Sequence, residues 1–259
     1  MQGVNHCASG VAVGFAVAPV LGMHTLTAAL PFALILGGFA LSNDLDCDHA
    51  KASTALGPIS EFLSFILRKL SKLAFTLTKG PKDKPSAGTH RHLTHTLAFA
   101  VGAGFLASWT GSLSLWAVGA WLVFGAVSAS AALTLKAEGA PPKKTARTML
   151  VVFLLTLFIT PLVGMSSPSP QQALLAGLEG AQHWLGIAVG LGCLVHLVGD
   201  AMTVSGVPLV WPIPIRGQFW YSLHLLPRRI RLHTGKRFEQ WIVHPLFIGA
   251  IAGTAYILM

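Results

Sequence analysis

The chain has 259 residues, of which 53% are hydrophobic and 10% are charged, and its formal net charge is +9. Soluble proteins contain about a quarter charged residues. Together with a mean hydropathy of +0.64, this deficit excludes a water-soluble globule and indicates a polytopic membrane protein. The three cysteines are too few for a disulfide framework, so free thiols are expected.

Seven apolar segments predict an all-α bundle of transmembrane helices. In chain order, the expected spans are about 8–22, 25–41, 94–110, 113–135, 148–165, 183–199 and 241–258. Residues 1–43 and 92–135 contain no Asp, Glu, Lys or Arg, so each of these stretches fits two crossings of about 20 residues. We expect one integral membrane domain over residues 1–259, whose first apolar run stays in place as a helix.

The basic residues predict the orientation of the bundle. All 18 Lys and Arg fall into three loops, which follow the second, fourth and sixth predicted spans. With seven spans these loops lie on one side, and the positive-inside rule makes that side, and the N-terminus, cytoplasmic. The expected location is the inner (plasma) membrane. No nucleic-acid-binding module accompanies the net charge, so no direct nucleic-acid partner is expected.

A basic insert at about 50–89 separates the second and third spans. Within it, Gly57 to Lys79 has the pattern of an amphipathic helix. Its apolar face carries Phe62, Ile66, Leu70, Leu73 and Leu77. Two interpretations remain open: the helix lies on the inner leaflet, where anionic headgroups attract it, or it packs on the bundle.

A second insert, at about 201–240, is apolar but unsuited to a spanning helix. Four prolines interrupt it, at Pro208, Pro212, Pro214 and Pro227, and proline breaks helices. Because it also contains Trp211, Trp220 and Tyr221, we expect a loop in the membrane–water interface.

Four polar clusters lie at the ends of predicted spans. They are His6 before the first, Asn43–His49 (NDLDCDH) after the second, His90–Thr96 (HRHLTHT) before the third and His196–Asp200 (HLVGD) after the sixth. His196 and Asp200 are four residues apart and share one face of a helix. His90 and His95 can converge only if the third span begins between them, near Leu93 or Thr94.

The predicted topology places all four clusters at one level, the cytoplasmic ends of their helices. Polar side chains at the hydrocarbon boundary tend to face the bundle interior, where a shared metal ion would neutralise the carboxylates. The simpler alternative is helix capping. Three aspartates, Asp44, Asp46 and Asp48, follow a helix C-terminus, where negative charge is unfavourable. A metal site is therefore the preferred interpretation.

These residues resemble the YdjM-type family of membrane-bound metal-dependent hydrolases, which are described as LexA-binding and inner-membrane-associated. The family pattern is an N-terminal His, D-x-D-H, H-R-x-x-T-H and H-x-x-x-D-x-x-T-x-x-G-x-x-x-x-x-P. It is matched in order by His6, Asp44 or Asp46 onward, His90, Arg91, Thr94, His95, His196, Asp200, Thr203, Gly206 and Pro212. The resemblance implies an α-helical membrane bundle and a hydrolase, and it leaves the substrate open.

Two details of the resemblance are unsettled by the sequence. The acidic motif fits in two registers, either Asp44 with Asp46, or Asp46 and Asp48 with His49, and Asp46 belongs to both. The segment HTGKRFE also resembles a late T-G followed by an acidic residue in the family, which makes Glu239 a weaker site candidate.

The predicted activity is metal-dependent hydrolysis of an ester or phosphoester in an amphiphilic, lipid-like substrate. The expected ligands are His6, Asp44, Asp46, His49, His90, His95, His196 and Asp200. Zinc is expected ahead of manganese or iron, because the ligands mix imidazole and carboxylate. Arg91 would hold an anionic oxygen, and Thr94 or Glu239 would position water or relay a proton.

Two other functions remain open at this point. The same His and Asp residues could serve a cation or proton-coupled transporter, although transporters place such groups near mid-membrane. Alternatively, the protein is a non-catalytic membrane scaffold whose basic loops bind a cytoplasmic regulator, as the family's LexA association suggests. Membrane lipids are expected partners in every case.

Overall fold

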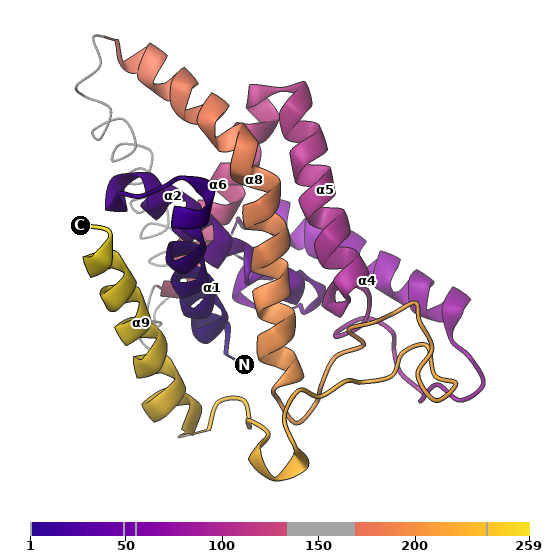
Figure 1. Ribbon diagram of the computed structural model, residues 1–259. Helices are drawn as coiled ribbons and strands as arrows, with labels where there is room; N and C mark the ends of the chain where they lie inside the picture. Colours follow the sequence, from indigo (N-terminus) through magenta and orange to yellow (C-terminus); the bar gives the residue numbers. More distant parts are fainter. Residues whose placement is uncertain (1, 49, 55, 134–168, 237) are drawn as a thin grey trace.

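The computed structural model describes residues 2–48, 50–54, 56–133, 169–236 and 238–259 (Figure 1). The membrane-type helices are α1 (Gly3–Val17), α2 (Leu26–Phe39), α5 (Leu97–Leu113), α6 (Leu115–Leu133), α8 (Pro170–Ala201) and α9 (His244–Ile257). Shorter or polar elements are η1 (Ala18–Leu21), η2 (Ser42–Asp46), α3 (Lys51–Thr54), α4 (Pro58–Thr78), η3 (Leu93–His95), η4 (Arg228–Ile230) and the π-turn η5 (Glu239–Val243). The described residues form isolated β-bridges and no strand, so the all-α prediction is confirmed.

Five helical segments of the described chain are long and apolar enough to cross a membrane. They are Gly3–Leu21, Leu26–Asp46, Leu115–Ala132, Leu174–Ala201 and Glu239–Ile257. The apolar helix α5 has 17 residues, which is the lower limit of about 17 for a span. These six correspond to six predicted spans, and the predicted span at 148–165 lies outside the described residues. The count of seven and the cytoplasmic N-terminus stay predictions.

One predicted boundary is wrong by several turns. The span expected at 183–199 belongs to a helix of 32 residues that begins at Pro170. Ser169 caps this helix by accepting a hydrogen bond from the backbone N–H of Gln172, and proline is favoured in a first turn. Polar residues such as Gln182 and His183 lower the hydropathy of the first half without breaking the helix, so hydropathy alone misses its start.

Small residues let the central helices approach closely. A Cβ atom added at Gly10 of α1 would lie 2.7 Å from the Cα of Gly37 in α2, and one added at Gly104 of α5 would lie 2.8 Å from the carbonyl oxygen of Gly186 in α8. Close backbone contact of this kind is the usual way in which membrane helices associate. Phe32 of α2, whose side chain is fully buried, lies edge-on to the ring of Trp184 in α8 with centroids 5.6 Å apart.

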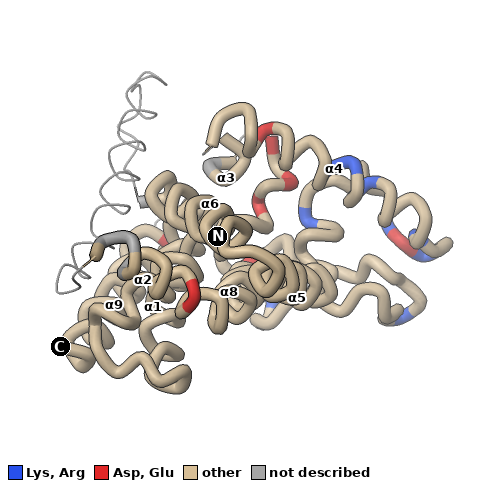
Figure 2. The backbone as a smooth tube through the Cα atoms, turned by 90° about the horizontal axis from the view of Figure 1, so that it is seen from above, with Lys and Arg blue, Asp and Glu red and all other residues tan. Residues whose placement is uncertain are grey.

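Helix α9 and helix α4 lie at the outside of the bundle. Figure 1 shows α9 beside α1 and α4 running across the direction of α5 and α8. Many lysines and arginines follow α4 and the loop beside it, whereas the bundle helices are almost free of charge (Figure 2). The observed bounds of α4, Pro58–Thr78, agree with the amphipathic helix predicted from Gly57 to Lys79.

The loop after α8 packs against the end of α4. The indole rings of Trp211 and Trp220 stack with their centroids 5.0 Å apart, and both indole N–H groups lie 3.1 Å from the hydroxyl oxygen of Thr78. Asp83 accepts a hydrogen bond from the backbone N–H of Trp220. Part of this proline-rich loop is therefore a packed structure that joins α4 to the end of α8.

Candidate metal centre

Seven polar side chains from four distant segments meet at the lower end of α8 as drawn in Figure 1. We call them the His/Asp cluster: His6, Asp44, Asp46, His90, His95, His196 and Asp200. They form three overlapping groups, and within each group the candidate ligand atoms all lie within 4.8 Å of one another. The structure thus brings together seven of the eight predicted ligands. The eighth, His49, lies outside the described residues.

Local structure explains how each segment delivers its side chains. His6 lies in the second turn of α1, and His196 and Asp200 lie one turn apart at the end of α8. After Phe39, α2 gives way to the 3-10 turn η2, which directs Asp44 and Asp46 inward. Thr96 caps α5 by accepting from the N–H of Phe99, and η3 precedes it. The predicted start near Leu93 or Thr94 is therefore that of η3, whereas α5 itself begins at Leu97, after both histidines. The ring centroids of His90 and His95 lie 5.4 Å apart.

Hydrogen bonds fix the orientation of three imidazole rings. Nδ1 of His196 lies 2.8 Å from the carbonyl oxygen of Ala40, which can only accept, so Nδ1 is the donor. Nδ1 of His90 likewise donates to Asp46 at 2.7 Å. The Thr94 hydroxyl donates to Asp46 and so accepts from Nδ1 of His95 at 3.0 Å. In each neutral ring Nε2 is left to bind a cation, as in metal sites whose histidines are oriented by outer hydrogen bonds.

The spacing of three ligand atoms fits one metal ion. Nε2 of His95 and Nε2 of His196 are 3.2 Å apart, and Oδ2 of Asp200 lies 3.5 Å from the first and 3.7 Å from the second. A tetrahedral ion with bonds of about 2.1 Å separates its ligands by about 3.4 Å. Two imidazole lone pairs facing each other at this distance need a proton or a cation between them. The donor set therefore fits a divalent metal.

Asp44 and His6 extend the same region on either side. Oδ1 of Asp44 lies 3.6 Å from Nε2 of His196 and 3.9 Å from Nε2 of His95. The ring of His6 stacks on that of His196 with centroids 3.8 Å apart, and its Nε2 lies 3.2 Å from Oδ1 of Asp200. Nδ1 of His6 is buried without a hydrogen-bond partner. An unsatisfied buried imidazole nitrogen is costly, and a bound ion or water would relieve it.

The structure distinguishes the two registers of the acidic motif. Asp44 and Asp46 point into the His/Asp cluster, whereas Asp48 forms an ion pair with Arg68 of α4 and its side chain is 51% exposed. Asp46 is the most tightly held, because it also accepts from the backbone N–H of Arg91 at 3.1 Å. The geometry therefore favours the register with Asp44 and Asp46.

Arg91 is bound to the cluster rather than free beside it. Its guanidinium donates to Oδ2 of Asp200 at 2.9 Å and to the hydroxyl of Thr203 at 3.2 Å. Its backbone has a φ of 58°, a left-handed conformation that is uncommon for residues other than glycine. Three contacts stabilise this strained conformation. The backbone N–H of Arg91, its guanidinium and the neighbouring His90 all bind aspartates of the cluster.

The cluster is buried on most sides and open on one. The side chains of His95, His196 and Asp46 are fully buried, whereas those of His90, Arg91 and Asp44 are 41%, 21% and 21% exposed. The cluster is therefore in contact with solvent along this edge. With neutral histidines, three carboxylates and one guanidinium leave an excess of negative charge, which a divalent cation would balance.

Electrostatics hold a proton on His95 when no cation is bound. Burial alone lowers the pKa of this imidazole, but the carboxylates of Asp46 and Asp200 outweigh burial and raise the pKa to about 9. The ring is then an imidazolium at neutral pH. A positive charge is therefore favoured where the Nε2 atoms of His95 and His196 meet, and a metal ion competes with the proton for that place.

Glu239 lies apart from the contacts of the cluster. Its two carboxylate oxygens accept from the backbone N–H of Gln2 at 2.5 Å, the side-chain amide of Asn5 at 2.9 Å and the backbone N–H of Gly235 at 2.7 Å. Asn5 also lies 2.7 Å from Nδ1 of His244 through its side-chain oxygen. These contacts fasten the start of α1, one residue before His6, to the start of the last helix.

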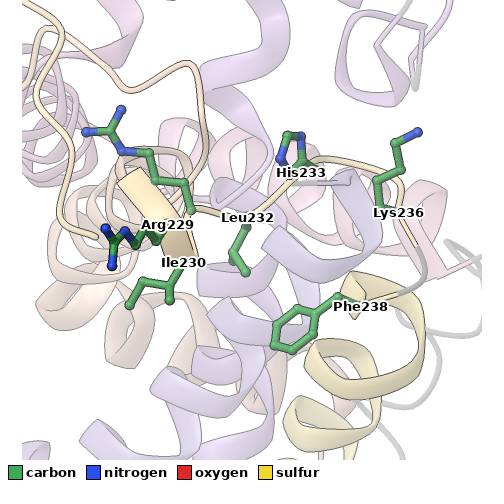
Figure 3. Close-up of a pocket in the computed structure, with 7 residues that line it drawn as sticks. Arg229, Ile230, Leu232, His233, Lys236 and Phe238 are labelled. Atoms are coloured by element: carbon green, nitrogen blue, oxygen red, sulfur yellow. The ribbon is translucent and has the colours of Figure 1, made fainter. Parts of the chain in front are cut away.

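A pocket of about 530 Å³ lies next to the segment that follows Asp200. Its lining residues are Arg229, Ile230, Arg231, Leu232, His233, Lys236 and Phe238. Figure 3 shows the apolar side chains of Ile230, Leu232 and Phe238 in the lower part of the view, whereas the side chains of His233 and Lys236 point upward. The backbone of Leu232 donates to the carbonyl of Met202, so one wall of the pocket is joined to the chain just beyond the cluster.

Some functional contacts had little or no signal in the sequence. The carbonyl of Ala40 orients His196, and a backbone acceptor leaves no trace in residue type. Asn43 donates to the carbonyl of Thr94 at 2.8 Å and Asn5 links Glu239 to α1. Asn43 is the first residue of a predicted cluster and Asn5 directly precedes His6, so an amide side chain next to candidate ligands was the available clue.

Comparison with known proteins gives a family. The model of the family described as YdjM inner membrane protein matches residues 1–139 and 147–258. No curated protein and no solved structure matches the chain. The family description and the five candidate spans agree on a multi-pass protein of the inner membrane. Because the match covers nearly the whole chain and all seven residues of the His/Asp cluster, the chain belongs to the YdjM inner membrane protein family.

Proposed function

We propose that this protein is a metal-dependent hydrolase whose centre is the His/Asp cluster. One or two divalent ions would be held by His6, Asp44, Asp46, His90, His95, His196 and Asp200. When bound, such an ion supplies Lewis acidity that makes water nucleophilic at neutral pH. Zinc is the first candidate, ahead of manganese or iron, because imidazole and carboxylate ligands in a compact set suit it.

The observation that carries this proposal is the triangle formed by His95, His196 and Asp200. Its sides of 3.2, 3.5 and 3.7 Å fit a single small cation. The hydrogen bond from His196 to Ala40 holds one corner in place. A transporter could use the same residues, but the buried triangle with outer hydrogen bonds favours a preorganised resident site over one that must release its ion.

The chain's own residues have separate tasks in this proposal. The hydroxyl of Thr94 donates a hydrogen bond to Asp46, so Thr94 orients a ligand. Arg91 holds Asp200 through one arm of its guanidinium, and its partly exposed side faces the open edge, where it can bind an anionic oxygen of the substrate. Glu239 holds the start of α1 and thereby the place of His6. Among the described ligands, His90 has the most exposed side chain, so it would be the ligand closest to water at the open edge.

The proposed substrate is an anionic amphiphile of the inner membrane, with an ester or phosphoester bond. The pocket beside the segment after Asp200 combines cationic Arg229, Arg231 and Lys236 with apolar Leu232 and Phe238. Cationic side chains would bind the anionic headgroup of such a molecule, and the apolar side chains beside them would contact its hydrocarbon chain. The pocket could orient such a molecule while its scissile bond reaches the cluster.

Metal content of the purified protein is the first test. We expect near-stoichiometric metal by plasma mass spectrometry in wild type and loss of metal in His196→Ala and Asp46→Ala. His183→Ala is the matched control, because His183 is an exposed histidine of the same helix α8. Metal-free protein after reloading with zinc, manganese and iron would contradict the metal centre, and a scaffold that binds a cytoplasmic regulator would then lead.

Activity is tested separately in vesicles of phosphatidylglycerol with bound metal confirmed. We expect slow release of fatty acid or headgroup that requires the metal and disappears in Asp46→Ala. If the metal binds and no lipid ester or phosphoester is cleaved, the hydrolase proposal fails. Movement of a divalent ion across sealed vesicles under the same conditions would favour the transporter.

A further inference from the structure

Helix α4 carries a continuous apolar surface that no described part of the chain covers. Eight large apolar side chains of the helix are exposed, and all but Phe65 belong to this surface: Ile59, Phe62, Leu63, Ile66, Leu70, Leu73 and Leu77, which are 36% to 74% exposed. Successive residues of an α-helix are about 100° apart, so these seven fall in one sector that is roughly 100° wide. A surface of this kind on one helix needs an apolar environment.

The other two sides of α4 have different surroundings. The buried side chains Ser60, Ser64, Ser71 and Phe75 form a second sector that faces the protein. The third sector carries Lys69 and Lys72, with Lys79 directly after the helix, and it also holds Glu61 and Phe65, whose ring centroid lies 5.4 Å from Nζ of Lys69. One side of the apolar sector therefore adjoins the protein and the other adjoins a row of positive charge, as in a helix that lies along the bundle at a membrane surface.

The position of α4 in the fold agrees with a location at the membrane surface. It runs across the direction of α5 and α8 and projects beyond the bundle (Figures 1 and 2). It is attached to η2 and η3, the turns that continue from α2 and precede α5. Because these turns stand at the ends of apolar helices, α4 lies at the level where the hydrocarbon of the membrane ends.

The buried side of α4 is fastened to both loops that supply the His/Asp cluster. Ser71 donates to the carbonyl oxygens of Gly88 and Thr89 at 2.8 Å and accepts from the N–H of Leu93 at 3.2 Å. Phe75 lies edge-on to the ring of His92 with centroids 4.8 Å apart. These contacts hold the segment from Gly88 to His95, which contains His90, Arg91 and Thr94.

The acidic loop is fastened to the same helix by charge. Arg68 forms an ion pair with Asp48, two residues after Asp46. One helix thus contacts the two segments that bring Asp44 and Asp46 on one side and His90 and His95 on the other. A displacement of α4 would change the distance between these ligands.

We propose that α4 is an in-plane membrane helix whose apolar sector lies among the acyl chains of the inner leaflet and whose lysines bind anionic lipid headgroups. Through Ser71, Phe75 and Arg68, the lipid surface then holds the two ligand-bearing loops at their working distance. The lipid contact goes beyond hydrolysis and does not depend on it. Its readouts involve no catalysis, so failure of either proposal is seen separately.

Site-directed fluorescence tests the position of α4. In a Cys47→Ser background, where Cys7 and Cys193 are buried, a bimane label is placed at Leu73→Cys in the apolar sector or at Thr76→Cys in the charged sector. The full chain is placed in discs of equal phosphatidylcholine and phosphatidylglycerol. We expect nitroxide on the acyl chains to quench the label at 73, and acrylamide in water to quench the label at 76.

Three outcomes would overturn this placement. Equal quenching of both labels by acrylamide would mean that the apolar sector faces water. Protection of the label at 73 from both quenchers would mean that protein covers it. Unchanged quenching by nitroxide in discs of phosphatidylcholine alone would remove the role of anionic headgroups, since we expect weaker quenching there.

Hydrogen exchange tests whether α4 stabilises the segment that carries His90 and His95. In the same discs, Leu70→Ser with Leu73→Ser should speed amide exchange across the segment from Gly88 to Thr96. Leu70→Met with Leu73→Met is the matched control, because methionine keeps the apolar surface and should leave exchange as in wild type. Unchanged exchange in the serine variant, with a bimane label at Leu77→Cys in the apolar sector showing that this sector has left the acyl chains, would refute the link.

Discussion

The Nε2 atoms of His95 and His196 face each other at 3.2 Å, although the two residues are 101 positions apart. Both rings are fully buried. Nδ1 of His95 donates to the hydroxyl of Thr94, and Nδ1 of His196 donates to the carbonyl oxygen of Ala40. Neither ring can turn away without leaving a buried donor unpaired. In this geometry a proton or a cation must lie between the two atoms, so metal binding at this pair would depend on pH.

Metal affinity should rise with pH and then level off. The pKa of His95 is raised to about 9 because the pull of Asp46 and Asp200 outweighs burial, so below that pH the incoming ion must displace a proton. Between about pH 7 and 9 we expect affinity to increase about tenfold per unit, because one proton is exchanged for the ion. Titration against a competing chelator at several pH values measures this, and a flat profile would show that His95 is neutral before the metal binds.

The hydroxyl of Thr94 should matter for metal affinity although it binds no metal. It donates to Oδ2 of Asp46 and accepts from His95, so Thr94→Val removes the support of two ligands at once. We expect a loss of roughly 10- to 100-fold in affinity, as is usual for residues that orient metal ligands. Thr94→Ser keeps the hydroxyl and should stay close to wild type. Equal affinities of the valine and serine variants would rule out the role.

The sequence predicted those features that depend on residue type and spacing. Runs of apolar residues located six described helices, and the four-residue spacing of His196 and Asp200 placed them on one face. The convergence of His90 and His95 was predicted from a helical start near Leu93 or Thr94, where the 3-10 turn η3 begins, although α5 itself starts only at Leu97. The shared level of the polar clusters followed from the positions of the helix ends.

Other features depend on contacts between distant segments and could not be predicted. The two registers of the acidic motif are equivalent in sequence, and they are separated by the position of Asp44 in the cluster and the pairing of Asp48 with Arg68. Glu239 looked like a site residue because of its family position, whereas its observed partners are Gln2, Asn5 and Gly235. Amphipathic periodicity described the apolar side of α4 but gave no sign that Ser71 forms hydrogen bonds with the segment from Gly88 to Leu93.

Close packing of α1 on α2 should be sensitive to added side-chain volume. A Cβ atom at Gly10 would lie 2.7 Å from the Cα of Gly37, so Gly10→Val must separate the two helices. Overpacking of this kind costs about 1–3 kcal/mol, and it should also shift His6, one turn earlier in α1. Gly102→Ala is the control, because nothing lies within 4 Å of its added Cβ. Thermal unfolding in detergent should show a lower midpoint for Gly10→Val alone, and equal midpoints would contradict the observed contact.

Glu239 should influence the metal centre from a distance. Its carboxylate receives three hydrogen bonds that hold Gln2 and Asn5, next to His6. Glu239→Gln replaces one acceptor oxygen by a donor, which faces donors already present and pushes the start of α1 away. Because His6 contacts Asp200 and stacks on His196, we expect weaker metal binding while the ligands themselves are unchanged. Glu179→Gln, an exposed carboxylate of α8, should bind metal normally. If Glu239→Gln keeps wild-type metal affinity but abolishes hydrolysis, Glu239 takes part in the reaction itself, and the predicted effect on metal binding through α1 is wrong.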